Sequence, residues 1–290
     1  KKSGPPKHII KKSDHRNKMK KQTNTMKFST ALMSVGLLLP TTASAATVVL
    51  ANPAADYVAA AGGPTATLTT APTGWSYLGA TTANGGTETA LTAGQVGNQS
   101  ASYQGFVGSS TAGTASVYGT NTADPAQFEI FSNGDLNGGV VGTDLLLHPG
   151  QAGNADEFAI VRFTIGDDSM FAAGTGTVSG SFRDLIVGGG AAAQSVAVSV
   201  FHNSTSLFST EGGTTAQGTP GILTQADGTF NVTGLTLATG DTIDFVVGQN
   251  VHFGADETAL QAAIGVDTIP EPSTALLGGL GLLGLLRRRR

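Results

Sequence analysis

The stretch Val196–Val200 (VAVSV) alternates valine with a small or polar side chain at every second position. A similar alternation recurs in Ile243–Val247 (IDFVV), where Ile243, Phe245 and Val247 share one face. Because successive side chains of a strand point to opposite sides, each stretch can bury one face against a second sheet. The two stretches therefore predict strands of an antiparallel β-sandwich.

Short apolar and β-branched runs extend this pattern over residues 46–268, and Gly-rich or Asx-rich turns such as Asp227-Gly228 separate them. Short strands with turns about every 8–12 residues are typical of sandwiches and jelly rolls. We expect one all-β domain, an antiparallel, jelly-roll-like β-sandwich, with a short helix near Asn52–Ala60. The predicted strands are Trp75–Leu78, Ser102–Phe106, Ala115–Tyr118, Phe128–Phe131, Asp144–Leu147, Phe158–Ile165, Gly176–Val178, Phe182–Val187, Ser195–Phe201, Ser206–Phe208, Thr229–Val232, Leu235–Leu237, Thr242–Val247 and Ala259–Ile264.

Charge is distributed very unevenly along the chain. Between Thr47 and Ile269 the only Lys or Arg residues are Arg162 and Arg183, against eighteen Asp and Glu, so the formal charge of this part is 2 − 18 = −16. Such a domain has no basic patch to neutralise phosphates, which argues against a nucleic-acid partner. The chain has no cysteine, so disulfides, thiolate metal sites and a cysteine nucleophile are excluded.

Two segments at the N-terminal end have the composition of a leader. Residues 1–25 are basic and polar, and we interpret them as an over-extended gene start, with Met26 or Met19 as the first residue; a tail that binds nucleic acid or a membrane surface is the alternative. Residues 26–45 have the order of a secretory signal peptide, with a charged start, the apolar run Ala31–Leu39, and small residues at Ala43 and Ala45. We expect cleavage after Ala45 or Ala46.

Residues 269–290 form a tail with a fixed order of features. Pro270-Glu271-Pro272 precedes the apolar run Ala275–Leu286, which four arginines follow: Arg287, Arg288, Arg289 and Arg290. The arginines favour cytoplasmic retention, which leaves the preceding domain outside, as the signal peptide also predicts. Twelve apolar residues as a helix span about 18 Å, less than the ~30 Å hydrocarbon core, so a transmembrane helix here would serve as a transient handle.

This tail resembles the sorting signal of PEP-CTERM proteins, which are exported by Gram-negative bacteria that make extracellular polysaccharide. The resemblance implies that an exosortase, a membrane-embedded cysteine transpeptidase, cuts near Pro270-Glu271-Pro272. Residues 156–264 also resemble a domain common in exported PEP-CTERM proteins, through Asp156-Glu157-Phe158, Ser181–Asp184, Val198–Asn203, Gly240–Val247 and Phe253–Thr258. Such regions are similar in layout to carbohydrate-binding jelly rolls.

The domain offers few candidates for catalysis. Its histidines are about fifty residues apart, near predicted strand ends, and we interpret them as surface residues: His148, His202 and His252. Two carboxylates facing each other across a cleft could hydrolyse glycosidic bonds. The candidate carboxylates are Glu129, Asp135, Asp156, Glu157, Asp167, Asp168, Asp256 and Glu257.

Two kinds of ligand remain open. Asn133–Gly138 (NGDLNG) places oxygen ligands at alternate positions, as calcium prefers, although a plain turn explains it equally well. Sugar binding requires exposed aromatic side chains, and the alternative is that these belong to the core. The aromatic candidates are Trp75, Tyr77, Tyr103, Tyr118 and Phe253.

We therefore expect a non-enzymatic protein of the cell surface or extracellular matrix, with no cofactor and no bound metal, that is associated with polysaccharide or is purely structural. A secreted glycan-active hydrolase is the alternative. The expected partners are signal peptidase, the exosortase and extracellular polysaccharide, and the tail inserts transiently in the inner membrane before the chain reaches the surface.

Overall fold

The computed structural model describes residues 46–62, 68–95, 104–108, 115–119, 144–155, 157–169, 171–185, 196–211, 223–250, 256–269, 278, 281 and 284–288. The chain divides into two units, Lys1–Thr41 and Thr42–Arg290, and all the described residues belong to the second. The predicted gene-start extension and signal peptide, with Ala43 and Ala45, lie outside the described residues. The domain boundaries predicted for them stay predictions.

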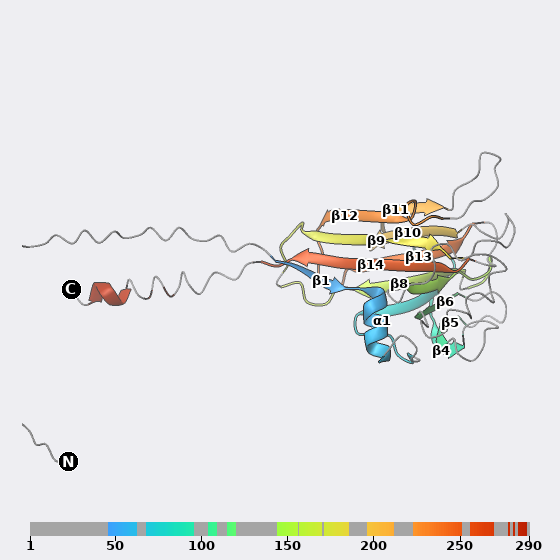
Figure 1. Cartoon of the computed structure of the whole chain (residues 1–290), viewed down its shortest axis with the longest axis horizontal. Coiled ribbons are helices and arrows are strands. Elements are labelled where there is room, and N and C mark those ends of the chain that lie inside the picture. Colours follow the sequence, from blue (N-terminus) through green and yellow to red (C-terminus); the bar gives the residue numbers. More distant parts are fainter. Residues whose placement is uncertain are drawn as a thin grey trace, which may run out of the picture. The chain divides into compact units, whose positions relative to one another are not determined.

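In the described part of the chain the strands form two sheets, and every strand pairing is antiparallel (Figure 1). The larger sheet has the order β12-β9-β14-β7-β6-β5-β4, with β1 also paired to β14; the smaller has the order β11-β10-β13-β8-β2-β3. The element bounds are β1 Thr47–Ala51, α1 Pro53–Ala61, β2 Trp75–Ala80, β3 Glu88–Ala90, β4 Thr92–Gln95, β5 Gln104–Val107, β6 Ser116–Gly119, β7 Leu145–His148, β8 Phe158–Thr164, β9 Gly176–Asp184, β10 Val196–His202, β11 Thr205–Glu211, β12 Thr229–Leu235, β13 Thr242–Gln249 and β14 Thr258–Asp267.

From β7 to β14 each successive strand lies in the other sheet, except at the β10–β11 hairpin. This alternation is the crossing pattern of a jelly roll. The predicted antiparallel, jelly-roll-like β-sandwich is confirmed.

The core lies between the sheets and is built from the inward faces of their strands. On β10 and β13 the predicted apolar faces are fully buried, with Val198 opposite Val247 and Val200 opposite Phe245. The larger sheet contributes its own inward residues to the same cluster: Val178, Phe182, Phe230, Leu260 and Ile264. Burial of both faces supplies the main stabilisation.

The outer face of the smaller sheet is partly covered by the segment 81–87, which joins β2 to β3. Ile160 and Val246 are both 1% exposed on this face, and Ala83 packs against their cluster. Asn84 fixes the segment, because its Nδ2 donates to the carbonyl of Ser204 at 2.8 Å. The predicted alternation of apolar and exposed faces therefore fails locally at Val246.

The helix α1 follows the prediction closely. Asn52 is its N-cap, since the side-chain oxygen accepts a hydrogen bond from the Ala55 N–H at 2.9 Å. Gly62 ends the helix in the left-handed conformation with φ 77°, which glycine adopts without strain.

Several strand predictions are wrong in their extent. β9 is one strand where two were predicted, and Gly180 lies inside it. The glycine is needed there because a Cβ would lie 2.1 Å from the Gln261 carbonyl oxygen and 2.8 Å from the Phe230 ring. β12 likewise runs through Gly234, where the register shifts, and ends at Leu235. The strands β1, β3 and β4 were not predicted. The predicted strand Phe128–Phe131 lies outside the described residues.

Candidate functional site

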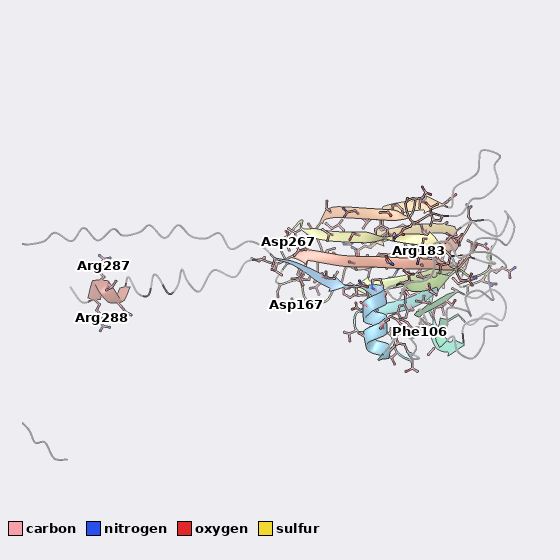
Figure 2. The ribbon with its side chains drawn as sticks, viewed as in Figure 1. Phe106, Asp167, Arg183, Asp267, Arg287 and Arg288 are labelled. Carbon is pink, nitrogen blue, oxygen red and sulfur yellow. The ribbon has the colours of Figure 1, made fainter. Side chains whose placement is uncertain are left out.

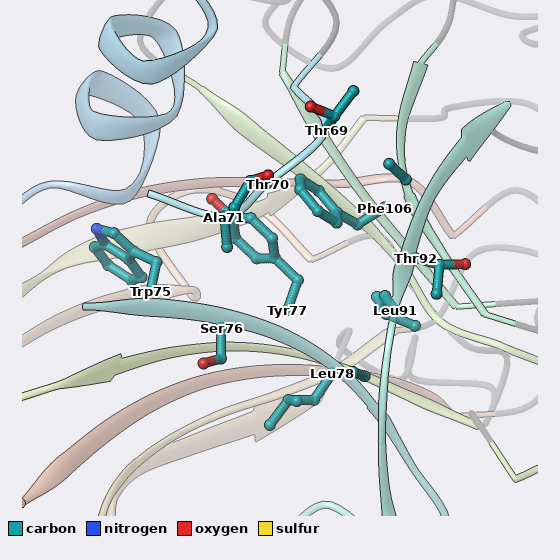
Figure 3. A pocket seen from close by; sticks show the side chains of 12 residues that line it. Thr69, Thr70, Ala71, Trp75, Ser76, Tyr77, Leu78, Leu91, Thr92 and Phe106 are labelled. Carbon is teal, nitrogen blue, oxygen red and sulfur yellow. The ribbon is translucent and has the colours of Figure 1, made fainter. Parts of the chain in front are cut away.

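A pocket of ≈ 480 Å³ lies at the edge where the chain passes from the smaller sheet to the larger (Figure 3). β3 pairs with β2 in one sheet and β4 pairs with β5 in the other, and Leu91 connects them. The Leu91 N–H donates to the Tyr77 carbonyl at 2.9 Å, which ties this crossing to β2. The pocket is lined by Thr69, Thr70, Ala71, Trp75, Ser76, Tyr77, Leu78, Ala90, Leu91, Thr92, Ala93 and Phe106.

Aromatic rings form the inner side of this pocket. The ring centroids of Tyr77 and Phe106 are 4.6 Å apart and tilted by 45°, and Tyr57 lies 6.1 Å from Tyr77 on the core side. Tyr77 is only 3% exposed, and burial, followed by the nearby Tyr57 and Asp56, raises the pKa of its hydroxyl. The phenol therefore stays neutral.

Trp75 is held in place by α1 rather than left free to stack on a ligand. Asp56 Oδ2 accepts a hydrogen bond from Trp75 Nε1 at 2.9 Å and another from the Asn52 N–H at 3.0 Å. The indole packs on Phe163 with ring centroids 5.0 Å apart, and Trp75 is 5% exposed. Of the predicted aromatic candidates, Trp75 and Tyr77 thus belong to the core and the pocket floor. Tyr103, Phe253 and the side chain of Tyr118 lie outside the described residues.

The rim of the pocket carries hydroxyl groups and no charge among the residues that line it. Thr69, Thr70 and Thr92 are exposed and Ser76 is half-buried. Hydroxyls around an apolar, aromatic floor suit a neutral ligand with several hydroxyl groups. These threonines and Ser76 were not singled out in the sequence.

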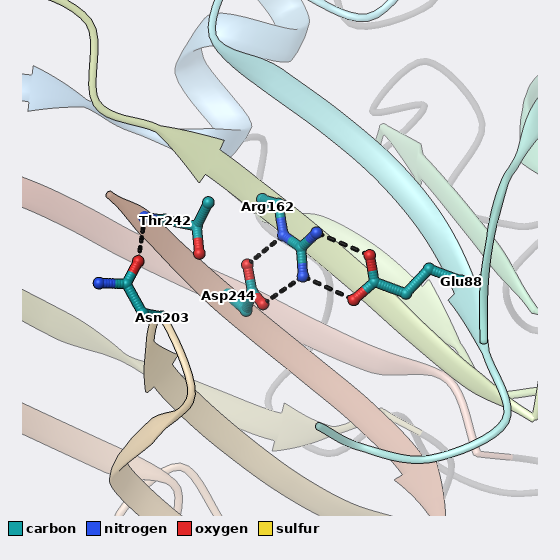
Figure 4. A network of polar contacts seen from close by, with 5 residues as sticks. All are labelled: Glu88, Arg162, Asn203, Thr242 and Asp244. Carbon is teal, nitrogen blue, oxygen red and sulfur yellow. Dashed lines mark hydrogen bonds and ion pairs between the residues drawn. The ribbon is translucent and has the colours of Figure 1, made fainter. Parts of the chain in front are cut away.

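An ion-pair network on the outer face of the smaller sheet holds β3, which forms one wall of the pocket (Figure 4). Arg162 on β8 donates to both oxygens of Glu88 and both oxygens of Asp244, each at 2.7 Å. The hydrogen bonds that Arg162 donates to Asp244 and then to Glu88 raise the pKa of Arg162 further, so it stays charged. Because Glu88 begins β3, this fork fixes the short strand against β8 and β13.

The described histidines do not converge. His148 is the last residue of β7, and its Nδ1 lies 2.6 Å from the carbonyl oxygen of Pro149, the next residue. His202 Nε2 lies 3.0 Å from Asp241 Oδ2, and Asn203, in the left-handed region at φ 53°, donates to the other oxygen of Asp241. That group joins the β10–β11 turn to the turn before β13, a structural role. His252 lies outside the described residues.

None of the described candidate carboxylates lines the pocket. Asp167 accepts a hydrogen bond from the Ser169 N–H within one turn, and Asp168 accepts one from Thr239 Oγ1 in the loop before β13. Glu157 accepts from the Gly153 N–H at 3.0 Å. Asp256 and Glu257 are instead buried just before β14, near Asp184. The remaining candidates, Glu129, Asp135 and Asp156, lie outside the described residues.

The predicted calcium loop Asn133–Gly138 also lies outside the described residues. Among the residues that the structure does describe, no group of three or more His, Asp or Glu side chains is arranged to hold a metal ion.

Strand β1 and the end of β14 pair where the two predicted processing segments meet the domain; we call this pairing, residues 46–51 and 264–268, the clasp. Thr47 lies opposite Asp267, and its Oγ1 donates to Asp267 Oδ1 at 2.5 Å. The carbonyl of Ala46 accepts from the Thr268 N–H at 3.0 Å and from Thr268 Oγ1 at 3.3 Å. Figure 2 labels Asp267 at this end of the domain and Arg183 toward the other.

The tail beyond the clasp is described only in part. Residues 278, 281 and 284–288 are helical, which agrees with a short apolar helix, and Arg287 and Arg288 are exposed. Pro270, Glu271, Pro272, Arg289 and Arg290 lie outside the described residues, so their predicted roles stay predictions. No helix in the described part of the chain is long and apolar enough to cross a membrane.

Residues 268–290 match the PEP-CTERM protein-sorting motif. The chain therefore carries the sorting signal that its tail predicted, and this motif implies export, a membrane-associated sorting intermediate and processing by an exosortase. The match begins at Thr268, the residue that closes the clasp.

Comparison with whole proteins adds little to this motif. No curated protein matches the chain significantly. Among solved structures, a CBM51 from Clostridium perfringens GH95 in complex with methyl-galactose is 13% identical, with a TM-score of 0.27 over 43% of this chain and 70% of that one. A Stig cyclase, Fisc from Fischerella sp. TAU, in complex with (3Z)-3-(1-methyl-2-pyrrolidinylidene)-3H-indole, is 11% identical, with a TM-score of 0.31 over 70% of this chain and 89% of that one. TM-scores this low carry no argument about the fold, so the assignment of the fold rests on the strand pairing of this chain.

The hydrogen bonds of the clasp favour one of the two predicted signal peptidase sites, after Ala45 or after Ala46. Cleavage after Ala46 would remove the carbonyl that accepts both hydrogen bonds from Thr268, whereas cleavage after Ala45 preserves it. We therefore expect Ala46 as the first residue of the mature protein, and intact-mass and N-terminal peptide analysis of protein from the native cell will show it. Mature chains that begin at Thr47 would contradict this assignment.

Proposed function

We propose that this protein is a non-enzymatic component of the cell surface or extracellular matrix, whose pocket between β2 and β5 binds a neutral part of an extracellular polysaccharide. The observation that carries the proposal is the lining of the pocket: aromatic rings inside, hydroxyl groups at the rim, and no charged side chain. A pyranose ring has apolar faces and several hydroxyl groups, which match the aromatic inner side and the hydroxyl groups at the rim of the pocket.

Charge narrows the class of polysaccharide. The formal charge of −16 between Thr47 and Ile269 repels an anionic polymer such as a uronic-acid chain. The two arginines that could counter this are bound elsewhere, Arg162 by Glu88 and Asp244 and Arg183 by Asp144. A neutral glycan is therefore favoured over an acidic one.

The same lining favours binding over catalysis. A glycoside hydrolase needs two carboxyl groups on opposite sides of the scissile bond. The described candidate carboxylates are instead engaged in turns, or buried in the group around Asp256. This supports the proposal against the hydrolase alternative.

Filling the pocket tests the proposal. Ala90 lines the pocket and is exposed on β3, so Ala90→Trp should obstruct the pocket without disturbing the core. We expect it to weaken binding of neutral extracellular polysaccharide by about tenfold or more, equal to roughly 1.4 kcal/mol, as measured by glycan array and isothermal titration.

The matched control is Ala60→Trp, which adds the same side chain at an exposed position of α1 outside the pocket. It should bind as the wild type does. Equal binding by wild type and Ala90→Trp would place the ligand elsewhere. Release of new reducing ends from the glycan by the wild type would overturn the non-enzymatic part of the proposal.

A further inference from the structure

The described sandwich exposes large hydrophobic side chains at one place. Val48 and Val49 on β1 are 41% and 63% exposed, and Ile269, just beyond β14, is 49% exposed. In the part of the chain that the structure describes, the other strongly exposed large hydrophobic residues are Leu285 and Leu286 in the tail helix. Among the described residues of the domain, the strongly exposed large hydrophobic side chains thus lie in the clasp and at the residue that follows it.

The clasp also sets the distance of the domain from both apolar segments of the chain. Residues 40–45 separate the apolar run of the signal peptide from Ala46, and residues 269–274 separate Thr268 from the apolar run of the tail, which is six residues in each case. A fully extended stretch of six residues spans only about 20 Å. Whichever segment is in the membrane, the clasp cannot lie far from the lipid surface.

We propose that the clasp is the membrane-facing end of the domain, held at the lipid surface first by the signal segment and then by the sorting tail. This inference rests on the export route of the proposed function, since it needs the apolar tail to enter the membrane. The occupant is the lipid surface itself, because Val48, Val49 and Ile269 meet it where both tethers emerge. Adsorption by charge is not involved, as the domain is acidic and Asp167 and Asp267 lie at this same end (Figure 2).

One consequence is that the two ends of the mature domain remain joined through both processing steps. The carbonyl of Ala46 accepts from the Thr268 N–H, so in the folded domain the N-terminal strand is paired beside the start of the sorting motif. The Pro270-Glu271-Pro272 motif then begins two residues after Thr268, outside the clasp. Exosortase can cut there without opening the sandwich.

The chain lacks cysteine, so a single introduced cysteine can carry a unique label. We would label Val49→Cys at the clasp and Glu211→Cys at the far end, where β11 ends. β14 has ten residues and spans about 33 Å, so the two labels lie at very different heights if the clasp faces the membrane. The full chain, exported in a host without an exosortase, is reconstituted in phosphatidylcholine vesicles that contain lipids spin-labelled at the headgroup.

We expect the spin-labelled lipids to reduce the fluorescence of the label at position 49 and to leave the fluorescence of the label at position 211 unchanged. Thr268→Pro removes the N–H that donates to Ala46, and should abolish the difference, whereas Thr268→Val keeps that N–H and should preserve it. Equal quenching at both positions, in a chain that floats with the vesicles, would overturn the orientation alone. A full chain that does not float with the vesicles would overturn the anchoring step on which the proposed function depends.

Discussion

Replacing Asp256 by Asn is expected to raise the free energy of unfolding at about pH 9 by roughly 2–4 kcal/mol and to flatten its dependence on pH. Asp256 is fully buried, and neither of its carboxylate oxygens has a hydrogen-bond partner in the described part of the chain. Burial, and then the charges of Asp184 and Glu257, raise the pKa of Asp256 to about 9. The native domain therefore holds this carboxyl group in its protonated form near neutral pH.

Composition explains why no cation relieves this burial. Arg162 and Arg183 are the only Lys or Arg residues between Thr47 and Ile269. Both form ion pairs with carboxylates other than that of Asp256. Asp184 and Glu257, which face Asp256, add negative charge, and the nearest histidine in sequence, His252, lies outside the described residues. A proton is then the simplest counterpart for the buried carboxylate.

The sign of the pH dependence follows from linkage. In the unfolded chain an Asp titrates near pH 3.9, so between about pH 4 and pH 9 the folded state binds a proton that the unfolded state does not. The contribution of Asp256 to stability is complete below about pH 4 and is lost as the pH rises toward 9. Asn cannot ionise, so the variant lacks this loss.

Urea unfolding of both proteins at about pH 5, 7 and 9 measures the effect. Glu211→Gln is the control, because it removes a carboxylate at an exposed strand end and should leave the slope unchanged. A wild type whose stability rises from pH 5 to pH 9 would contradict a protonated Asp256. So would a calcium-dependent stabilisation at pH 9 that Asp256→Asn abolishes, since that would show an ionised carboxylate with a bound cation.

The strands that could be predicted are those whose own residues decide their burial. β10 alternates regularly, and β13 does so apart from the apolar Val246, so each side chain could be assigned to a face, and their cross-strand partners match that assignment. β3 and β4 could not be found this way, because Glu88–Ala90 is exposed throughout and Thr92–Gln95 has no apolar period. Their strands form because β2 and β5 offer free edges, which is a tertiary cause.

The candidate site shows the same division. Trp75 and Tyr77 were recognisable as aromatic candidates, but their burial depends on α1 and β5, which pack on them from distant parts of the chain. The hydroxyls of the rim come from Thr- and Ala-rich stretches with no distinctive pattern, so no local signal marks them. For Arg162 and Arg183 a signal existed: two cations among eighteen acids are expected to be bound, although their partners could not be inferred.

Replacing Arg183 by Met should be among the most destabilising substitutions in the domain, with an expected cost of about 3–5 kcal/mol. Arg183 on β9 forms an ion pair with Asp144 on the outer face of the larger sheet, and the two residues are 6% and 1% exposed. Gln261 on β14 donates to the other oxygen of Asp144 at 2.7 Å, so β9, β14 and the start of β7 meet at this carboxylate. Removing the guanidinium takes away the charged partner of the buried Asp144 carboxylate.

A double-mutant cycle separates the lost charge pair from lost packing. Asp144→Asn keeps an oxygen that can accept from Gln261 but carries no charge, so Arg183→Met combined with Asp144→Asn should recover at least half of the loss in urea unfolding. Arg183→Lys retains a positive charge without the guanidinium fork and should cost about 1–2 kcal/mol. If the double variant were as unstable as Arg183→Met alone, the arginine would act through its aliphatic packing, and the ion pair would contribute nothing to holding the three strands together.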